Sequence, residues 1–203
     1  MSKGASAHYY IHYSLFITHY SLRCINTDFH ILPLSLDDLG EVLELEAAVI
    51  ASLERPDQLR RNTPEMWQAC LSAPHTAVGA RVGERLVALA VLYLPEAGSA
   101  EDLSCCLQGL DGILSPGVHK AANYKICIVH PHFRGHALQQ LLGRHLEEAA
   151  LRQGVQLLCS TVSPHNPASI RSLQRLGYRY NRTLAKYGFE RALYYKMLSD
   201  ANR

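Results

Sequence analysis

The stretch "CIVHPHFRGHALQQLL", Cys127 to Leu142, joins two different periodicities at one turn. The residues up to Val129 end an apolar run typical of a buried strand. After the turn, apolar residues recur at helical spacing. These positions are Leu138, Leu141, Leu142, Leu146, Ala149 and Ala150. We therefore expect a strand, a tight turn containing Arg134 and Gly135, and a long helix from near Gly135 to about Gln153.

The turn itself predicts an anion site. The first backbone N–H groups of a helix have no partner within the helix and lie at the positive end of its dipole. Small side chains at Gly135 and Ala137 let an anion approach those groups, and Arg134 adds charge and a forked donor. The pattern favours a cradle for a diphosphate. Glycine also occurs in such turns for geometry alone, so a second motif is needed.

A metal site is the alternative interpretation of this stretch, because it contains His130, His132 and His136. Metal ligands on a helix are spaced four apart and on a strand two apart. Pro131 interrupts the strand spacing, and His132 precedes the expected helix. No carboxylate lies between the histidines to act as a base. The metal interpretation is therefore the weaker one, and we expect no metal.

The remaining sequence predicts a mixed α/β fold. Expected strands cover residues 29–35, 75–82, 86–94, 123–129 and 155–162, followed by a final antiparallel pair. Expected helices run from a cap at Asp37 or Asp38 to about Leu53, from Pro64 to Leu71, and from Asn166 to Gly177. Residues 1–26, which repeat His-Tyr-Ser-Leu, read as a low-complexity extension, and 27–203 as a single domain. Pro95–Lys120 reads as an insertion or lid.

Composition narrows the function classes. The chain has 203 residues, of which 48% are hydrophobic and 19% charged, as in a globular protein with a sizeable core. A formal net charge of +2 gives no sign of a nucleic-acid or membrane partner. No C-x-x-C pair occurs among the six cysteines, and the N-terminus lacks a signal-peptide pattern. We expect a cytoplasmic protein with reduced thiols.

A second block strengthens the anion-site interpretation. The second block is "VSPHNPASIRSLQRLGYRY", Val162 to Tyr180. The two blocks and the separation between them resemble the GNAT superfamily of acyl-CoA-dependent N-acetyltransferases, and the resemblance covers roughly Asp28 to Leu198. The resemblance implies a central, mostly antiparallel mixed sheet with a splayed strand pair, flanked by helices. It also implies acetyl-CoA as cosubstrate.

The resemblance assigns the cosubstrate to specific residues. The diphosphate of CoA is expected against the backbone of a run that starts the helix. That run is Arg134, Gly135, His136, Ala137, Leu138 and Gln139. The pantetheine arm should pair like an extra strand with the edge formed by Cys127, Ile128 and Val129. Asn166 should touch the arm from the other side, and it is also a natural helix cap.

Three positions depart from the family pattern. Ala137 stands where the family often has Gly, and Gln139 where it has Gly or Ala. Leu173 stands where many members have a tyrosine that protonates the leaving thiolate. Leucine cannot do this, so another group protonates the thiolate or it leaves unassisted, which its pKa of about 8.5 permits.

The implied reaction is direct attack of an amine on acetyl-CoA in a ternary complex. The backbone N–H of Val129 is expected to point at the thioester carbonyl, where negative charge develops. A base must deprotonate the amine, and we single out Tyr124 and Tyr187. Further candidates with stronger structural explanations are His130, His165 and Glu190. A covalent route through Cys127 is disfavoured, because strand alternation sets His130 on the opposite face.

The acceptor is not readable from the sequence. The segments expected around its pocket carry mixed charge and show no preference for acidic or basic acceptors. We therefore expect only that the acceptor is a small-molecule or peptide amine. We expect no nucleic-acid and no membrane partner, and a homodimer through the final strand pair is left open. The main rival function is a catalytically inactive acyl-CoA-binding module, followed by a metal-dependent hydrolase using the three histidines.

Overall fold

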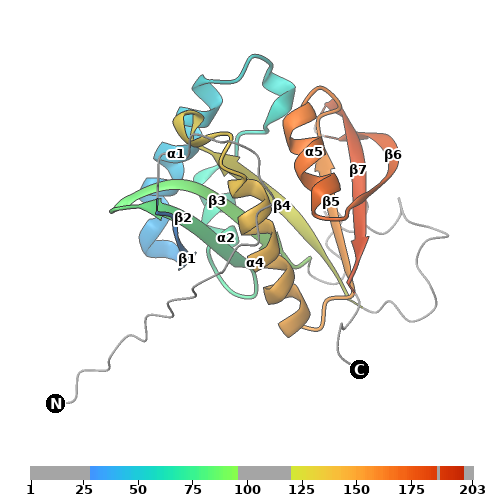
Figure 1. Ribbon diagram of the computed structural model, residues 1–203, viewed down its shortest axis with the longest axis horizontal. Coiled ribbons are helices and arrows are strands. Elements are labelled where there is room, and N and C mark those ends of the chain that lie inside the picture. Colours follow the sequence, from blue (N-terminus) through green and yellow to red (C-terminus); the bar gives the residue numbers. More distant parts are fainter. Residues whose placement is uncertain (1–27, 96–119, 187, 199–203) are drawn as a thin grey trace, which may run out of the picture.

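The computed structural model describes residues 28–95, 120–186 and 188–198. The expected N-terminal extension, Tyr187 and residues 96–119 of the expected insertion therefore lie outside the described residues. Within the described part, seven strands form a sheet in the order β1-β2-β3-β4-β5-β7-β6 (Figure 1). They are β1 (His30–Leu34), β2 (Thr76–Val82), β3 (Arg85–Tyr93), β4 (Ala121–Val129), β5 (Leu157–Val162), β6 (Arg179–Lys186) and β7 (Phe189–Met197).

Helices cover both faces of this sheet. They are α1 (Leu39–Ala51), α2 (Pro64–Cys70), α4 (Leu138–Arg152) and α5 (Pro167–Arg175), with short 3-10 turns η1 (Leu36–Asp38), η2 (Pro56–Gln58) and η4 (Pro131–Phe133). The apolar face of α4 packs on β2, β3 and β4, where Leu142 and Leu146 are buried. Helices α1 and α2 bury Val42 and Trp67 against the opposite face. Two apolar layers thus hold the sheet between them.

Strand directions confirm the expected fold class. The described neighbours pair antiparallel except β4 and β5, which run parallel. Parallel strands need a long crossover, and α4 provides it, as Figure 1 shows. Helix α5 then lies near α4 because Gly143 lets Leu176 approach. A Cβ at Gly143 would lie 2.5 Å from Leu176 Cδ1. The mixed sheet flanked by helices is as expected.

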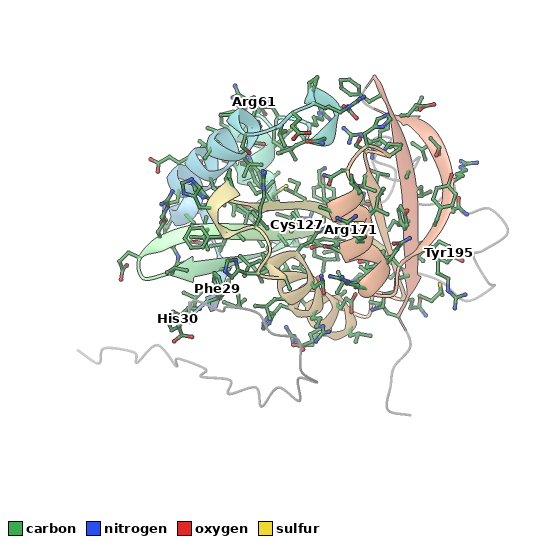
Figure 2. The ribbon with its side chains drawn as sticks, turned by 45° about the horizontal axis from the view of Figure 1, so that its top comes forward. Phe29, His30, Arg61, Cys127, Arg171 and Tyr195 are labelled. Atoms are coloured by element: carbon green, nitrogen blue, oxygen red, sulfur yellow. The ribbon has the colours of Figure 1, made fainter. Side chains whose placement is uncertain are left out.

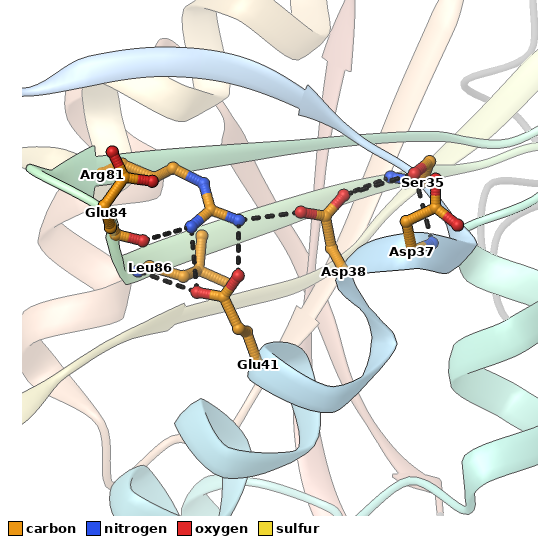
Figure 3. Close-up of polar contacts among 7 residues, drawn as sticks. All are labelled: Ser35, Asp37, Asp38, Glu41, Arg81, Glu84 and Leu86. Carbon is orange, nitrogen blue, oxygen red and sulfur yellow. Dashed lines mark hydrogen bonds and ion pairs between the residues drawn. The ribbon is translucent and has the colours of Figure 1, made fainter.

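The start of α1 differs from the sequence prediction. Asp38 stands at the N-cap position of α1, but its side chain caps no N–H group of the helix. The side-chain cap lies earlier, at η1, where Ser35 Oγ accepts from the Asp37 N–H and the Ser35 N–H donates to Asp38 Oδ2 at 2.8 Å. Asp38 is then free to pair with Arg81 of β2, Nη2 to Oδ1 at 2.7 Å (Figure 3). Serine and aspartate both cap helices, so residue type alone does not distinguish Ser35 from the two acids that follow it.

Arg81 ties α1 to the first hairpin. Its guanidinium also donates to Glu41 at 2.8 and 2.9 Å and to the Glu84 carbonyl (Figure 3). The hydrogen bond from Arg81 lowers the pKa of Glu41. This cluster fixes where α1 lies over β2, and the chain leaving α1 is one wall of the site described below.

The start of α4 is also later than predicted, at Leu138 and not near Gly135. Gly135 has φ +87° and Ala137 has φ +55°, both in the left-handed region. Residues in that region cannot continue a right-handed helix, so the turn between η4 and α4 is longer than the sequence suggested.

Candidate active site

The sheet opens between β4 and β5. These strands pair only from Ala121–Asn123 to Leu157–Cys159. At the next step, Ser160 Oγ donates to the carbonyl of Tyr124 at 3.0 Å in place of a strand-to-strand bond. Beyond that point the described structure pairs this edge of β4 with no strand. The splayed pair predicted from the sequence is confirmed, and Ser160, which sequence reasoning missed, marks where the splay begins.

A bulge in β4 sets which side chains face the opening. Opposite β3, Val91 pairs with Ile126 and Leu92 pairs with Tyr124, so Lys125 is an extra residue. Tyr124 therefore lies on the same face as Cys127, although strict alternation would separate them. Ile126 and Ile128 pack with the α1 layer on the other face. The side chains of Cys127 and Tyr124 interact directly.

The backbone of β4 past the bulge offers N–H groups to the opening. The His130 N–H donates to the Val87 carbonyl at 2.8 Å, which makes this pair hydrogen-bonded. Ladder bonds in antiparallel strands alternate, so the N–H groups of Val129 and Cys127 point away from β3. This is the orientation that the expected role of Val129 requires. The role itself stays a prediction.

The turn before α4 carries open amides. In the described structure, the N–H groups of Gly135 through Gln139 have no protein acceptor, and no side chain caps the helix. A Cβ at Gly135 would meet no heavy atom within 4 Å. The cradle is therefore uncapped and accessible, and its residues fit a diphosphate bound through backbone N–H groups.

Side chains near the cradle have defined partners. Arg134 donates to Ser52 Oγ at 2.8 Å at the end of α1, so its guanidinium is engaged there. Gln139 donates to Ser169 Oγ at 3.0 Å and so links α4 to α5. Asn166 Oδ1 accepts from the Ser169 N–H at 3.1 Å, so the predicted cap is present.

A cavity of about 460 Å³ follows the opening. It joins the residues of β4 to those of β5 and to the starts of α4 and α5. Its lining consists of Gln58, Leu59, Tyr124, Lys125, Ile126, Cys127, Gln139, Ser160, Thr161, Val162, Asn166 and Ser169. Of the expected cosubstrate contacts, Cys127, Gln139 and Asn166 are brought together here. Cys127 lies near the middle of the molecule (Figure 2).

A polar bridge joins the two sides of this cavity. Ser163 Oγ donates to Asp57 Oδ2 at 2.6 Å, and Gln58 Nε2 donates to the His165 carbonyl at 3.4 Å. Hydrogen bonds from Ser163 and then Arg55 lower the pKa of Asp57 to about 2. Residues more than 100 positions apart make these bonds. No local sequence signal identifies them.

A second cavity of about 610 Å³ adjoins the first and shares Tyr124, Lys125, Ile126 and Thr161 with it. Among its described lining residues, Arg60, Lys125, Lys186 and Arg191 are cationic and none is a carboxylate. The remaining lining residues are Gln58, Leu59, Asn62, Met66, Asn123, Tyr124, Ile126 and Thr161. The described lining is thus cationic, whereas residues 96–119, which the sequence also placed around the acceptor pocket, lie outside the described residues.

The buried carboxylate of Glu46 holds one wall of the second cavity in place. Its Oε1 accepts from the N–H and the side-chain amide of Asn62 at 3.0 and 2.9 Å. Its Oε2 accepts from Trp67 Nε1 at 3.0 Å. These bonds pin the segment between η2 and α2 to α1, so the wall that carries Arg60 has a fixed course.

The candidate bases differ in their surroundings. Burial raises the pKa of Tyr124 well above its ordinary value, and its hydroxyl donates to the Gln139 carbonyl at 3.1 Å. Tyr124 is therefore protonated at neutral pH, which suits a proton donor better than a base. His165 and Glu190 are exposed and do not line either cavity. Tyr187 lies outside the described residues.

Two further side chains have mainly structural surroundings. Burial raises the pKa of the Cys127 thiol to about 12, so it is not a nucleophile at neutral pH. His130 caps η4, and its Nε2 lies 2.8 Å from an Arg85 Nη atom. Burial and then Arg85 lower the pKa of His130, so its ring is neutral. These surroundings support the rejection of a covalent cysteine route.

The three histidines of the opening motif do not converge. The His130 and His132 rings lie edge to face, with centroids 5.1 Å apart, whereas His136 packs against Phe29. Among the described residues, no three histidine, cysteine or carboxylate side chains gather closely enough to hold a metal ion. The described residues therefore do not form the three-histidine metal site that a metal-dependent hydrolase would need.

A sheet opened between parallel strands, with an uncapped helix start beside the opening, is the arrangement that the resemblance to acyl-CoA-dependent acetyltransferases implied. Residues 46–178 match the model of the acetyltransferase (GNAT) family. The chain belongs to this family. A search of curated protein sequences found no match.

Solved structures agree on the fold. NAA60 of Arabidopsis thaliana, in complex with acetyl-CoA, superposes with a TM-score of 0.68 at 15% identity, over 84% of this chain and 99% of that one. YncA of Salmonella typhimurium, solved with its cofactor acetyl-CoA, gives 0.62 at 15% identity over 86% and 96%. The ribosomal-protein-S18-alanine N-acetyltransferase of Escherichia coli gives 0.63 at 16% identity over 86% and 97%.

In the described part of the chain, no helix is long and apolar enough to cross a membrane.

Proposed function

We propose that this protein is an N-acetyltransferase that moves the acetyl group of acetyl-CoA to a primary amine by direct attack in a ternary complex. One observation carries the proposal. The open edge of β4 leads directly to the uncapped N-terminus of α4. An extended amide-bearing arm can pair with such an edge while its diphosphate binds the helix start. Acetyl-CoA bound there supplies the thioester that the amine attacks.

The chain's own groups have distinct tasks in this reaction. The N–H of Val129, with that of Cys127 as a neighbour, faces the opening and polarises the thioester carbonyl. Tyr124 stays protonated and is the described candidate for returning a proton to the leaving thiolate. Tyr187 remains the proposed base. The bridge from Asp57 to Ser163 ties η2 to the loop that follows β5, beside the opening.

A catalytically inactive acyl-CoA-binding module is the second candidate. It is favoured by Leu173, which is 1% exposed and packs in the apolar core where many family members place a tyrosine. In that case the cradle would bind acetyl-CoA with no turnover of any amine. The two candidates share the binding step and differ only in the chemistry.

The first experiment is a calorimetric titration of the purified protein with acetyl-CoA, beside the variant Gly135→Glu. The glutamate places bulk and negative charge among the open amides, so binding should be lost. Gly83→Glu is the matched control, because Gly83 also has a left-handed φ of +56° and open surroundings but lies in the β2–β3 turn. A screen of amines for acetylation follows. Absence of acetyl-CoA binding by the intact protein contradicts both candidates.

We also propose the acceptor class, the compartment and the assembly in which the reaction takes place. The acceptor is a small-molecule or peptide amine, no metal takes part, and the enzyme works in the cytoplasm. Neither nucleic acid nor membrane is a partner. A homodimer is the assembly to test first, by light scattering with and without acetyl-CoA.

A further inference from the structure

We infer that the acceptor is a small amine that also carries an anionic group, a carboxylate or a phosphate, and that the cationic second cavity binds this group. This inference rests on the proposed function, since it names the acceptor class of the same site. It starts from the charges that line the cavity of about 610 Å³.

The lining cations come from separate parts of the chain. Arg60 follows η2, Lys125 is the bulged residue of β4, and Lys186 and Arg191 belong to the β6–β7 pair. The whole chain has a formal net charge of only +2. These four cations nevertheless meet at one cavity, whose described lining residues include no carboxylate.

Two of these cations are held in defined positions. Arg191 is only 5% exposed, so its guanidinium belongs to the interior of the cavity wall. Lys125 Nζ lies 3.9 Å from the centroid of the Tyr93 ring, which in turn stacks on His75. A buried guanidinium is a planar, forked donor that matches carboxylate and phosphate oxygens. The cavity thus has the chemistry of an anion site, and its sign excludes a simple cationic polyamine.

The position of the second cavity would let a bound anionic group orient the acceptor. It shares Tyr124, Lys125, Ile126 and Thr161 with the cavity along β4, so the two adjoin. Lys186 and Arg191 line only the second cavity. An acceptor anchored there by its anionic group directs its amine toward the opening where the acyl group is expected.

Nearby positive charge also helps the amine to react. An ammonium ion surrounded by cations loses its proton more easily, because like charges disfavour the protonated form. The same residues that bind the anionic group therefore raise the fraction of neutral, nucleophilic amine. This reduces the demand on a dedicated base, since Tyr124 stays protonated and no histidine stands among the described lining residues of either cavity.

Initial rates with matched acceptors test the inference. Each pair differs only in the anion: glutamate and glutamine, alanine and alaninamide, phosphoethanolamine and ethanolamine. We expect the more anionic member of at least one pair to have a kcat/KM about 10- to 100-fold higher, the range for a charge-assisted hydrogen bond. The amino acid and phosphate pairs distinguish a carboxylate from a phosphate.

Charge-removing variants locate the effect. Lys186→Met and Arg60→Met should remove most of the preference for the anionic acceptor by raising its KM. Arg175→Met removes a cation from the exposed end of α5, outside both cavities, and should leave the preference unchanged. Equal rates within every pair, or equal loss in Arg175→Met, would overturn the inference while the proposed function stands.

A binding measurement covers the case of a protein without turnover. N-acetylglutamate and N-acetylglutamine, which resemble products, are titrated into the protein with and without CoA. Preferential binding of the more anionic compound that Lys186→Met weakens about tenfold or more supports the cationic site even if no amine is acetylated. No preference by either measurement overturns the inference. Failure to bind acetyl-CoA, measured separately, overturns the proposed function alone.

Discussion

Two helices begin beside the same opening, and their first turns are built in opposite ways. At α5, Asn166 caps the Ser169 N–H with its side chain and Pro167 follows. At α4, Ala137 has a left-handed backbone and no side chain caps the open amides. The first arrangement satisfies the helix from within the protein. The second leaves the N–H groups at the start of the helix available to another acceptor.

The difference shows how stability and binding compete for the same groups. A side-chain cap contributes about 1 kcal/mol to helix stability. A helix start without one forgoes that contribution, and α4 offsets the loss by burying its long apolar face, including Leu142 and Leu146. The shorter α5 buries Leu173 alone within its bounds and has a cap. The longer helix can thus tolerate an exposed start.

The largest expected effect comes from giving α4 an internal anion. Ala137→Asp places a carboxylate beside the open amides, and aspartate tolerates a left-handed backbone. We expect acetyl-CoA affinity to fall roughly 100-fold, because like charges at such distances repel by about 3 kcal/mol at a partly exposed site. Calorimetry measures the affinity and thermal unfolding measures the stability, which should be unchanged or slightly higher.

The same charge at the other helix is the matched control. Asn166→Asp keeps a capping oxygen at α5, at the position where the proposal places the uncharged arm of the cosubstrate and not its diphosphate. The affinity should change less than about fivefold, since an uncharged arm feels little repulsion. Similar losses in both variants would mean that the diphosphate does not sit at α4.

Removing the side-chain cap of α5 should affect stability, whereas the change at α4 described above affects binding. Asn166→Ala leaves the Ser169 N–H without its acceptor, so the free energy of unfolding should fall by about 1 kcal/mol. Urea denaturation measures this directly. Ala137→Ser at α4 is the counterpart and should change stability much less, since no cap is present there to lose.

Replacing the left-handed Ala137 by glycine should have a smaller effect, and it should raise the stability instead of lowering it. Ala137→Gly should raise the free energy of unfolding by about 0.5–1 kcal/mol, because glycine accepts a φ of +55° without a Cβ clash. The measurement is again urea denaturation. Unchanged or lower stability would show that the turn before α4 is not strained. Acetyl-CoA affinity should stay the same within about twofold.

The bridge that holds the loop before α5 predicts a loss of stability that is confined to acid pH. Ser163 and Arg55 hold the pKa of Asp57 at about 2, below its ordinary value of 3.8. A lowered carboxyl pKa contributes stability above the unfolded value and loses it as pH falls through the folded value. The contribution of Asp57 should therefore disappear between about pH 4 and pH 2. Thermal unfolding across this range, beside Asp57→Asn, isolates it: the variant should lack this part of the pH dependence.

Local signals in the sequence predicted the framework well. The apolar periodicity after Leu138 gave α4, and Asn166-Pro167 gave the start of α5, because caps and helical faces depend on neighbours along the chain. The two motif blocks also gave the splayed sheet through their family resemblance. The exact start of α4 was predicted too early, since left-handed residues such as Gly135 and Ala137 leave no periodic trace in the sequence.

Features that depend on distant partners were not predictable. The cationic cavity needs Arg60, Lys125 and Arg191 side by side, and the segments that contain them look mixed in charge when read along the chain. The bridge between Asp57 and Ser163 joins two ordinary loop residues. The bulge at Lys125 lies within a run that reads as a regular strand, so nothing local marks the extra residue.

That extra residue means that β4 tolerates losing a residue here better than gaining one. Deleting Lys125 would restore strict alternation and keep Tyr124 and Cys127 on one face, because Leu92 and Val91 already pair with Tyr124 and Ile126. The isoleucines would stay packed on the α1 layer. One further residue inserted here, without a second bulge, would instead exchange the faces on one side of it, and Cys127 would turn away from Tyr124. An insertion of three nucleotides at this position would thus do more harm than a deletion of three.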